Sequence, residues 1–131
     1  MIEVFKSDRQ DEKFYSHMGM YFASLDIAKE LERQLYNKDG SVWYVSSYGG
    51  RTMGFAAVFD CGKYYFLDNL YVLHDFRNDG IAKEIVREII SNHTDKPIKC
   101  VANNPYALKI FYSNGFVEVG QNGKYKKLIK H

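Results

Sequence analysis

The chain of 131 residues is long enough for one domain with one hydrophobic core and short for two. Its composition, 46% hydrophobic, 16% aromatic and 26% charged, is typical of globular proteins and excludes a disordered chain. Lys and Arg exceed Asp and Glu by only 18 to 16, with both signs interspersed. We therefore expect no nucleic-acid partner and no lipid surface.

No apolar run approaches the ~20 residues of a membrane-spanning helix. The first residues, MIEVFKSDRQDEK, lack the apolar segment of a signal peptide, so a cytoplasmic protein is expected. Cys61 and Cys100 lack metal-ligand spacing, and no metal site is predicted. No linker rich in Pro, Gly or Ser occurs, so we expect residues 1–131 to form a single domain. The sequence is also compatible with a homodimer.

The N-terminal part is predicted to contain one strand and two helices. Residues 2 to 6, IEVFK, are typical of a short strand. Ser7 and Gln10 fit a capping box that would start a helix. Apolar residues then recur with helical period in two stretches, and the second is expected to end near Asn37 to Gly40.

Three runs rich in β-branched and aromatic residues follow. They are SVWYVSSY from Ser41, RTMGFAAVF from Arg51 and KYYFLDNLYVL from Lys63. Glycine-containing turns separate them, which favours a three-stranded antiparallel meander.

The remaining chain alternates between helices and strands. A helix is predicted from about Asn78 to Asn92, followed by KPIKCVA as a strand. Asn104 and Pro105 are typical of the cap and first position of another helix, which would close at Asn114. Two short strands finish the chain. The predicted order is therefore strand, two helices, three strands, helix, strand, helix and two strands, a mixed α/β fold.

The junction between the third strand of the meander and the next helix has the chemistry of an anion site. Unpaired backbone N–H groups at the helix start would point to one spot, with the positive end of the helix dipole behind them. Gly80 lets a phosphate approach the backbone, and Ala82 keeps the next turn open. Neither of the two common nucleotide motifs, GxxxxGK[ST] and GxGxxG after a strand, occurs. On its own, the stretch from Arg77 to Ala82 equally fits a plain strand-to-helix turn.

Arg77-Asn78-Asp79-Gly80-Ile81-Ala82 resembles the [QR]xxGx[GA] pyrophosphate loop of the GCN5-related N-acetyltransferase (GNAT) family. The preceding Leu70-Tyr71-Val72 is similar to the bulged fourth strand of that family. Asn104-Pro-Tyr-Ala107 with the later Gly115-Phe116 resembles its second motif, N-x-x-A followed by G-F. The order of elements is also similar, so the resemblance covers nearly the whole chain.

The resemblance implies the GNAT fold and acetyl-CoA as cosubstrate, held in a gap between the fourth and fifth strands. The pantetheine arm would pair with the backbone of Leu70, Tyr71 and Val72. The diphosphate would lie at the loop Arg77, Asn78, Asp79, Gly80, Ile81 and Ala82, with Lys83 near a phosphate. Asn104 would offer its side-chain amide to the cosubstrate, in addition to capping a helix.

For catalysis, the resemblance implies a carboxylate near the fourth strand that takes a proton from the acceptor amine, often through water. Asp68 occupies that place, and strand alternation would put it on the face of Leu70. A structural carboxylate held by neighbouring groups is the alternative.

Two positions depart from the family pattern. The tyrosine that often protonates the leaving thiolate is replaced by Phe111, and Tyr112 is the adjacent candidate acid. Asp79 puts a carboxylate beside the expected diphosphate. This carboxylate would either repel the diphosphate or face solvent.

The predicted function is therefore acetyl-CoA-dependent N-acetyl transfer to a primary amine, by direct transfer in a ternary complex. The alternative is a non-catalytic domain of the same fold that binds CoA or a protein partner. The acceptor, a small-molecule or peptide amine, stays open among polyamines, aminoglycoside-like drugs, protein N-termini and lysine side chains.

Overall fold

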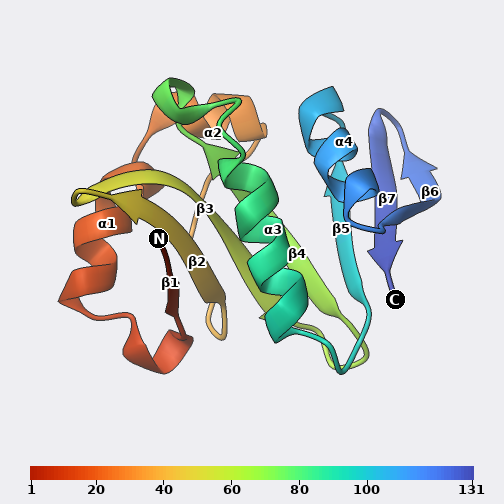
Figure 1. The fold of residues 1–131 in the computed structure, drawn as a ribbon, viewed down its shortest axis with the longest axis horizontal. Helices are drawn as coiled ribbons and strands as arrows, with labels where there is room; N and C mark the ends of the chain where they lie inside the picture. The colour runs from red at the N-terminus through yellow and green to blue at the C-terminus, as the bar shows by residue number, and fades with distance from the viewer.

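In the computed structural model, which describes residues 1–131, one seven-stranded sheet carries helices on both faces (Figure 1). The strands are β1 Ile2–Phe5, β2 Val42–Tyr48, β3 Arg51–Asp60, β4 Tyr65–Val72, β5 Ile98–Ala102, β6 Val117–Asn122 and β7 Tyr125–Lys130. The helices are α1 Glu12–Phe22, α2 Leu25–Leu31, α3 Ile81–Asn92 and α4 Pro105–Ser113, with short 3₁₀ turns η1 Ser7–Arg9 and η2 His74–Phe76. This order confirms the predicted mixed α/β fold.

The sheet has the order β1-β2-β3-β4-β5-β7-β6. Strands β1 to β4 pair antiparallel, as do β5 with β7 and β7 with β6. Only β4 and β5 are parallel. A parallel pair needs a crossover, and α3 supplies it between these two strands.

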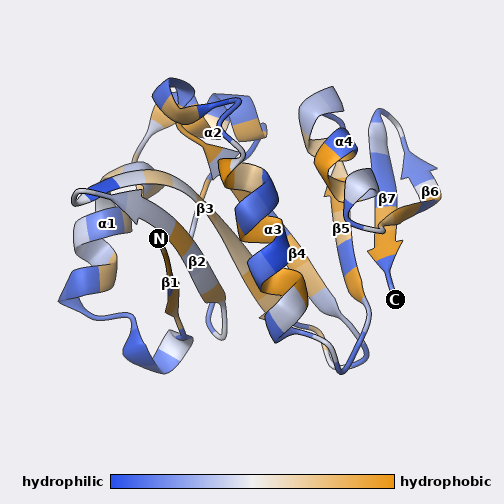
Figure 2. Cartoon of the chain, in the orientation of Figure 1, coloured by the Kyte–Doolittle hydropathy of each residue, from blue (hydrophilic) through white to orange (hydrophobic).

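Two apolar cores lie on opposite faces of the sheet. One packs α3 and α4 on the sheet through residues such as Ile85, Ile89 and Phe111. The other packs α1 and α2 on the opposite face through Phe14 and Ile27. Figure 2 shows hydrophobic colour on parts of β4 and β5 and toward the C-terminal end of β7, and polar colour on the outer side of α3. None of the helices is long and apolar enough to cross a membrane.

The predicted start of the first helix is wrong. Ser7 begins only a 3₁₀ turn, and Asp11 caps α1 by accepting a hydrogen bond from the Lys13 amide at 3.0 Å. The Gln10 side-chain amide instead donates to the carbonyl of Ser41, 3.0 Å away. Gln10 therefore ties the end of β1 to the start of β2, a long-range contact that outweighs the local capping pattern.

The predicted end of the second helix is also wrong. Helix α2 ends at Leu31, because Glu32 adopts a left-handed conformation with φ 61°. The Arg33 amide then donates to the Ala28 carbonyl at 3.0 Å, which closes the helix end. Leu35, expected on this helix, lies in the following loop, where it is 1% exposed.

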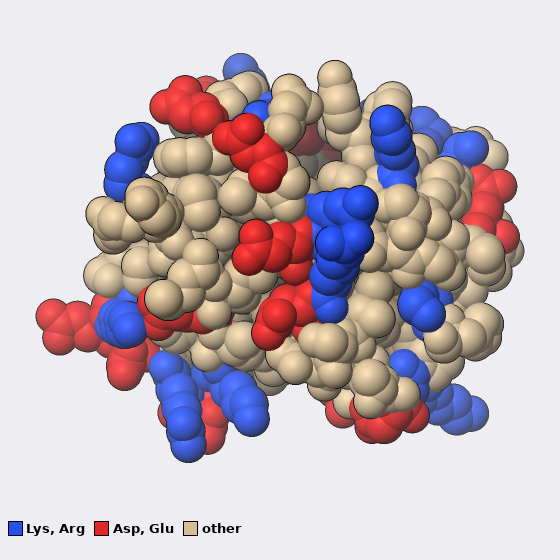
Figure 3. Space-filling model, viewed as in Figure 1, with Lys and Arg blue, Asp and Glu red and all other residues tan.

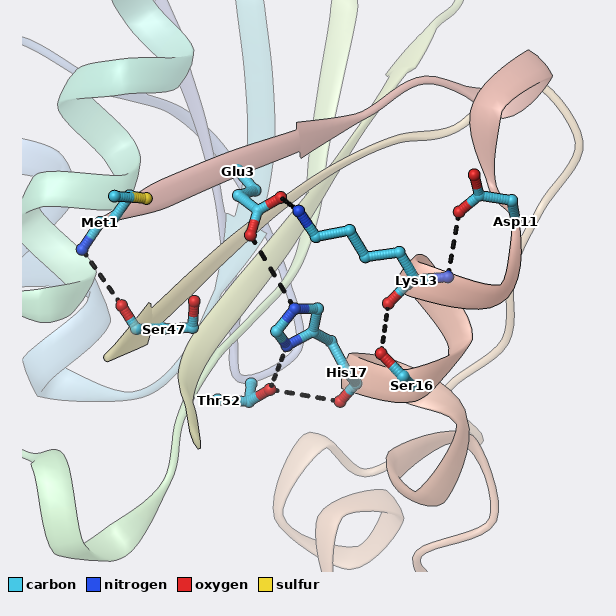
Figure 4. A network of polar contacts seen from close by, with 8 residues as sticks. All are labelled: Met1, Glu3, Asp11, Lys13, Ser16, His17, Ser47 and Thr52. Atoms are coloured by element: carbon cyan, nitrogen blue, oxygen red, sulfur yellow. Dashed lines mark hydrogen bonds and ion pairs between the residues drawn. The ribbon is translucent and has the colours of Figure 1, made fainter. Parts of the chain in front are cut away.

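Polar contacts fix α1 to the edge of the sheet (Figure 4). Lys13 forms a 2.8 Å ion pair with Glu3 on β1. The Thr52 hydroxyl on β3 donates to the His17 carbonyl at 3.3 Å. These contacts hold the N-terminal helix on the first and third strands.

Candidate active site

A cleft opens in the sheet because β4 and β5 separate. They pair only at Tyr65 with Ile98 and Phe66 with Lys99, and then diverge (Figure 1). The β4–β5 cleft has a volume of about 910 Å³, and β4, the loop to α3, the end of β5, α4, the end of α2 and Tyr125 line it. Beyond the last pair, backbone groups of β4 that point toward β5 lack a strand partner and can bind a ligand.

The face that carries α3 shows both signs of charge interspersed, with a hollow at its upper edge between the segments that carry α2 and α4 (Figure 3). No single-sign field therefore covers this face. Recognition at the cleft has to come from particular side chains and backbone groups.

A bulge in β4 shapes the wall of the cleft. The pairs Phe55 with Tyr71 and Ala57 with Asp68 leave two residues of β4 opposite one of β3, and Asn69 has φ 58°. A bulge interrupts the strand alternation. Leu67 and Leu70 consequently pack on the same face, with α3 and α4, whereas Tyr71 packs on the other. The expectation that Asp68 shares the face of Leu70 is therefore wrong.

Asp68 lines the cleft on the side of α2. It forms an ion pair with Arg33, which follows α2, and accepts a hydrogen bond from the Asn69 amide at 2.9 Å. The Arg33 guanidinium also donates to the Asn69 side chain at 3.1 Å. The side chain of Asp68 is 30% exposed and that of Arg33 49%. An acceptor can reach the carboxylate if this exposed guanidinium moves.

The loop between β4 and α3 forms the end of the cleft. Helix α3 begins at Ile81 rather than at the predicted Asn78, because Asn78 and Gly80 both have left-handed backbones, with φ 68° and 78°. The first helical hydrogen bond joins the Glu84 amide to the Gly80 carbonyl. The amides of Ile81, Ala82 and Lys83 therefore have no partner within the helix.

A Cβ added at Gly80 would meet no atom within 4 Å, so this glycine borders open space. Asn78, Gly80, Ile81, Ala82 and Lys83 line the cleft together with Leu70, Tyr71 and Val72. Asp79 does not line the cleft and is exposed.

Arg77 is held by the protein itself. Its Nε donates to the Val72 carbonyl and its Nη2 to Glu30, both at 2.8 Å. Glu30 also accepts from the Tyr71 hydroxyl at 2.8 Å and lies 2.9 Å from His74 Nε2.

The protonation of this cluster follows from its contacts. Burial acts to raise the pKa of Glu30, but hydrogen bonds from Arg77, Tyr71 and His74 outweigh it and lower the pKa to about 2. Burial and the Glu30 hydrogen bond raise the pKa of Tyr71 to about 12. Glu30 therefore stays ionised and fixes Arg77 at the start of the loop. Sequence reasoning missed Glu30, which lies 47 residues before Arg77.

The opposite wall comes from β5, α4 and β7. Asn104 lines the cleft and caps α4, where its Oδ1 accepts from the Tyr106 amide at 2.8 Å. Phe111 is buried against Phe116, with ring centroids 5.1 Å apart, and also lines the cleft. Tyr112 is 43% exposed and is not among the lining residues. The structure therefore does not bring Tyr112 together with Asp68.

A different tyrosine, Tyr125 on β7, lines the cleft. Its hydroxyl donates to Glu32 at the end of α2, a residue 93 positions earlier. No local pattern marks Tyr125, because only the fold brings it to the cleft.

Cys100 lies at the point where β4 and β5 part and lines the cleft. Burial raises the pKa of its thiol to about 12. The thiol is therefore protonated at neutral pH and is a poor nucleophile.

Comparisons with known proteins agree with this architecture. A family model described as an acetyltransferase (GNAT) domain matches residues 5–131. No curated protein sequence matches the chain significantly. Among solved structures, Escherichia coli ElaA superposes with a TM-score of 0.81 at 12% identity, covering 100% of this chain and 99% of that one. An acyl-CoA N-acyltransferase from Pseudomonas aeruginosa gives 0.78 at 11% identity, with 100% and 99% covered.

The PaiA N-acetyltransferase from Thermoplasma acidophilum, solved with coenzyme A, gives a TM-score of 0.70 at 15% identity, with 99% and 98% covered. At these identities the TM-scores show a shared fold and no more, whereas the family model covers almost every residue of the chain. With its divided sheet, bulged β4 and glycine loop before α3, the chain belongs to the GNAT acetyltransferase family.

Proposed function

We propose that this protein transfers the acetyl group of acetyl-CoA to a primary amine, directly and within a ternary complex. The observation that carries the proposal is the β4–β5 cleft, which ends at a glycine loop with free helix amides. Family membership supports acetyl transfer. Related structures are those of PaiA with coenzyme A and of an Elizabethkingia anophelis GNAT acetyltransferase with acetyl-CoA bound.

Acetyl-CoA would lie along the cleft as an additional strand. The backbone of Leu70 to Val72 can pair with the amide groups of the pantetheine arm, because β5 has already moved away. The diphosphate would accept hydrogen bonds from the amides of Ile81 to Lys83, with the positive end of α3 behind them. The Asn104 side chain uses its oxygen for capping, which leaves its NH₂ group to donate to the cosubstrate.

Two residues of the predicted loop have other roles in this proposal. Arg77 lines the cleft, but its Nε and Nη2 already donate to the Val72 carbonyl and Glu30, so we assign it no phosphate contact. It would instead fix the loop in its binding conformation. Asp79 is exposed and does not line the cleft, so its carboxylate would face solvent rather than the diphosphate.

The chemistry begins with removal of a proton from the acceptor ammonium. Asp68 would accept this proton, directly or through water, after Arg33 moves. The amine nitrogen then attacks the thioester carbon, and backbone N–H groups of β4 stabilise the oxyanion. The C–N bond forms, the nitrogen loses its second proton to solvent, the C–S bond breaks, and the thiolate of CoA leaves. Direct attack is favoured because the one cysteine of the cleft, Cys100, is protonated.

A dedicated acid for the leaving group is not required. A thiol ionises near pH ~8.5, so the CoA thiolate leaves readily and is protonated by solvent. Phe111 has no proton to donate, and Tyr112 does not line the cleft. Among the residues of the C-terminal strands, Tyr125 contributes a hydroxyl to the β4–β5 cleft.

The test is turnover with acetyl-CoA and a broad amine panel of amino acids, aliphatic amines, polyamines and lysine peptides. Free CoA is measured together with the mass of the acetylated product. We expect transfer to at least one class, strongly reduced in Asp68→Asn and unchanged in the exposed control Asp26→Asn. Tight acetyl-CoA binding without transfer to any amine would support the non-catalytic alternative and refute the proposal.

A further inference from the structure

A second cavity meets the cleft at the proposed base. It has a volume of about 200 Å³ and lies between β3, β4 and the loop that follows α2. Arg33, Phe66, Asp68 and Asn69 line both spaces. A molecule in this second cavity would therefore reach Asp68 from the side opposite to α3. If Asp68 is the base, as the proposed function on which this inference rests requires, an acceptor amine can approach it through this cavity.

The charges of the second cavity are unbalanced. Its lining contains two cations, Arg33 and Lys38, and one carboxylate, Asp68. Arg33 is already paired with Asp68. Lys38 lies 3.9 Å from the centroid of the Phe59 ring and takes part in none of the ion pairs of the structure. One positive charge in this cavity is therefore without a carboxylate partner.

The pair between Arg33 and Asp68 sets a condition on the acceptor. An ammonium group that approaches Asp68 has to displace the guanidinium. If the acceptor carries no other charge, Arg33 loses its carboxylate partner. The positive charges of Arg33 and Lys38 then both repel the incoming ammonium. If the acceptor also carries an anionic group, that group can take over Arg33 or Lys38 while the ammonium takes Asp68. Arg33 then keeps a carboxylate partner, and the same anionic group can also compensate the charge of Lys38.

We propose that the acceptor is a zwitterionic amine, an amino-acid-like molecule whose carboxylate is bound by Arg33 and Lys38 while its amine lies at Asp68. The remaining walls indicate what else it carries. Tyr36, Phe59, Tyr64 and Phe66 supply aromatic surface to the cavity. Such surface binds an apolar or aromatic side chain. A second ammonium would be repelled by Lys38, which already lies over the Phe59 ring. Polyamines are accordingly disfavoured.

The test compares two probes that share the ring and the amine and differ in the carboxylate, phenylalanine and phenethylamine. The measured quantity is the ratio of their kcat/KM values in the wild type, in Lys38→Met and in the control Lys29→Met. Lys29 is an exposed lysine of α2 that lines neither cavity. Comparing ratios cancels the different basicity of the two amines, because that difference is the same for every variant.

We expect the wild type to prefer phenylalanine, and Lys38→Met to lower this preference by ~10-fold, through loss of one charge-assisted contact to the carboxylate. Lys29→Met should keep the wild-type ratio. A wild type that prefers phenethylamine, or a ratio equal in all three proteins, would overturn the inference. Transfer to polyamines or lysine peptides but to neither probe would overturn it too, with the proposed function intact. If no amine of the broad panel is acetylated, the proposed function fails.

Discussion

Replacing Gly80 by valine tests the cleft end most directly. Its φ of 78° costs a residue with a Cβ ~1–2 kcal/mol, so we expect a fall in melting temperature of roughly 4–8 °C at about 4 °C per kcal/mol. Acetyl-CoA at a hundred times its Kd should stabilise the wild type by ~2.7 kcal/mol, or about 10 °C. The valine would occupy the open space at the loop. If it weakens binding ~100-fold, the same ligand concentration stabilises by only ~0.4 kcal/mol.

Gly50 provides the matched control for this experiment. It has φ 79°, its Cβ would also meet nothing within 4 Å, and it lies in the turn between β2 and β3, outside the cleft. Gly50→Val should therefore lose similar stability and keep the full acetyl-CoA shift. The assay is thermal unfolding with and without acetyl-CoA at several concentrations. A full shift in Gly80→Val would refute the placement of the diphosphate at this loop.

Three further predictions concern the base, the tyrosines and acid stability. Asp68→Asn should lower kcat ~10²-fold near neutral pH and less at alkaline pH, where the amine is already free; a rate profile unchanged across pH would return Asp68 to a structural role. Tyr112→Phe should lower kcat less than ~10-fold and less than Tyr125→Phe does, since of these two tyrosines only Tyr125 lines the cleft. Steady-state kinetics in which Tyr112→Phe has the larger effect would contradict this. Glu30 has a folded-state pKa of about 2, below its ordinary 4.5, so it contributes stability that is complete above pH ~4.5 and is lost as pH falls toward 2. Chemical unfolding at pH 7, 4.5 and 3 should show a smaller acid-induced loss in Glu30→Gln than in the wild type, and identical losses would count against the Glu30 contacts.

The order of the elements could be predicted from the sequence because each has a local cause. Glycine turns separate β2, β3 and β4, and Asn104 with Pro105 sets the start of α4. The loop before α3 was recognisable from its motif, and the structure adds that Gly80 has a left-handed backbone with φ 78°.

The parts that sequence could not supply depend on tertiary contacts. The family resemblance implied a bulged fourth strand, but the position of the bulge at Asn69 and its effect on the faces of β4 came only from the structure. Asp68 therefore lies on the side of α2, where Arg33 meets it. Glu30 and Tyr125 enter the site from elements distant in the chain. The periodicity of apolar residues describes one helix or strand at a time, so it does not predict contacts between elements that are distant in the chain.

The short parallel pairing of β4 and β5 has a consequence for how the molecule opens. With only two residue pairs across this boundary, few interstrand hydrogen bonds connect β1 to β4 with the unit formed by β5, β7 and β6. Local unfolding begins where backbone pairing is sparse, so amide hydrogen exchange should be fastest along this boundary. The two halves of the sheet would then behave as separate cooperative units whose motions are coupled mainly by the core beneath α3, and any ligand that bridges β4 and β5 would join them into one.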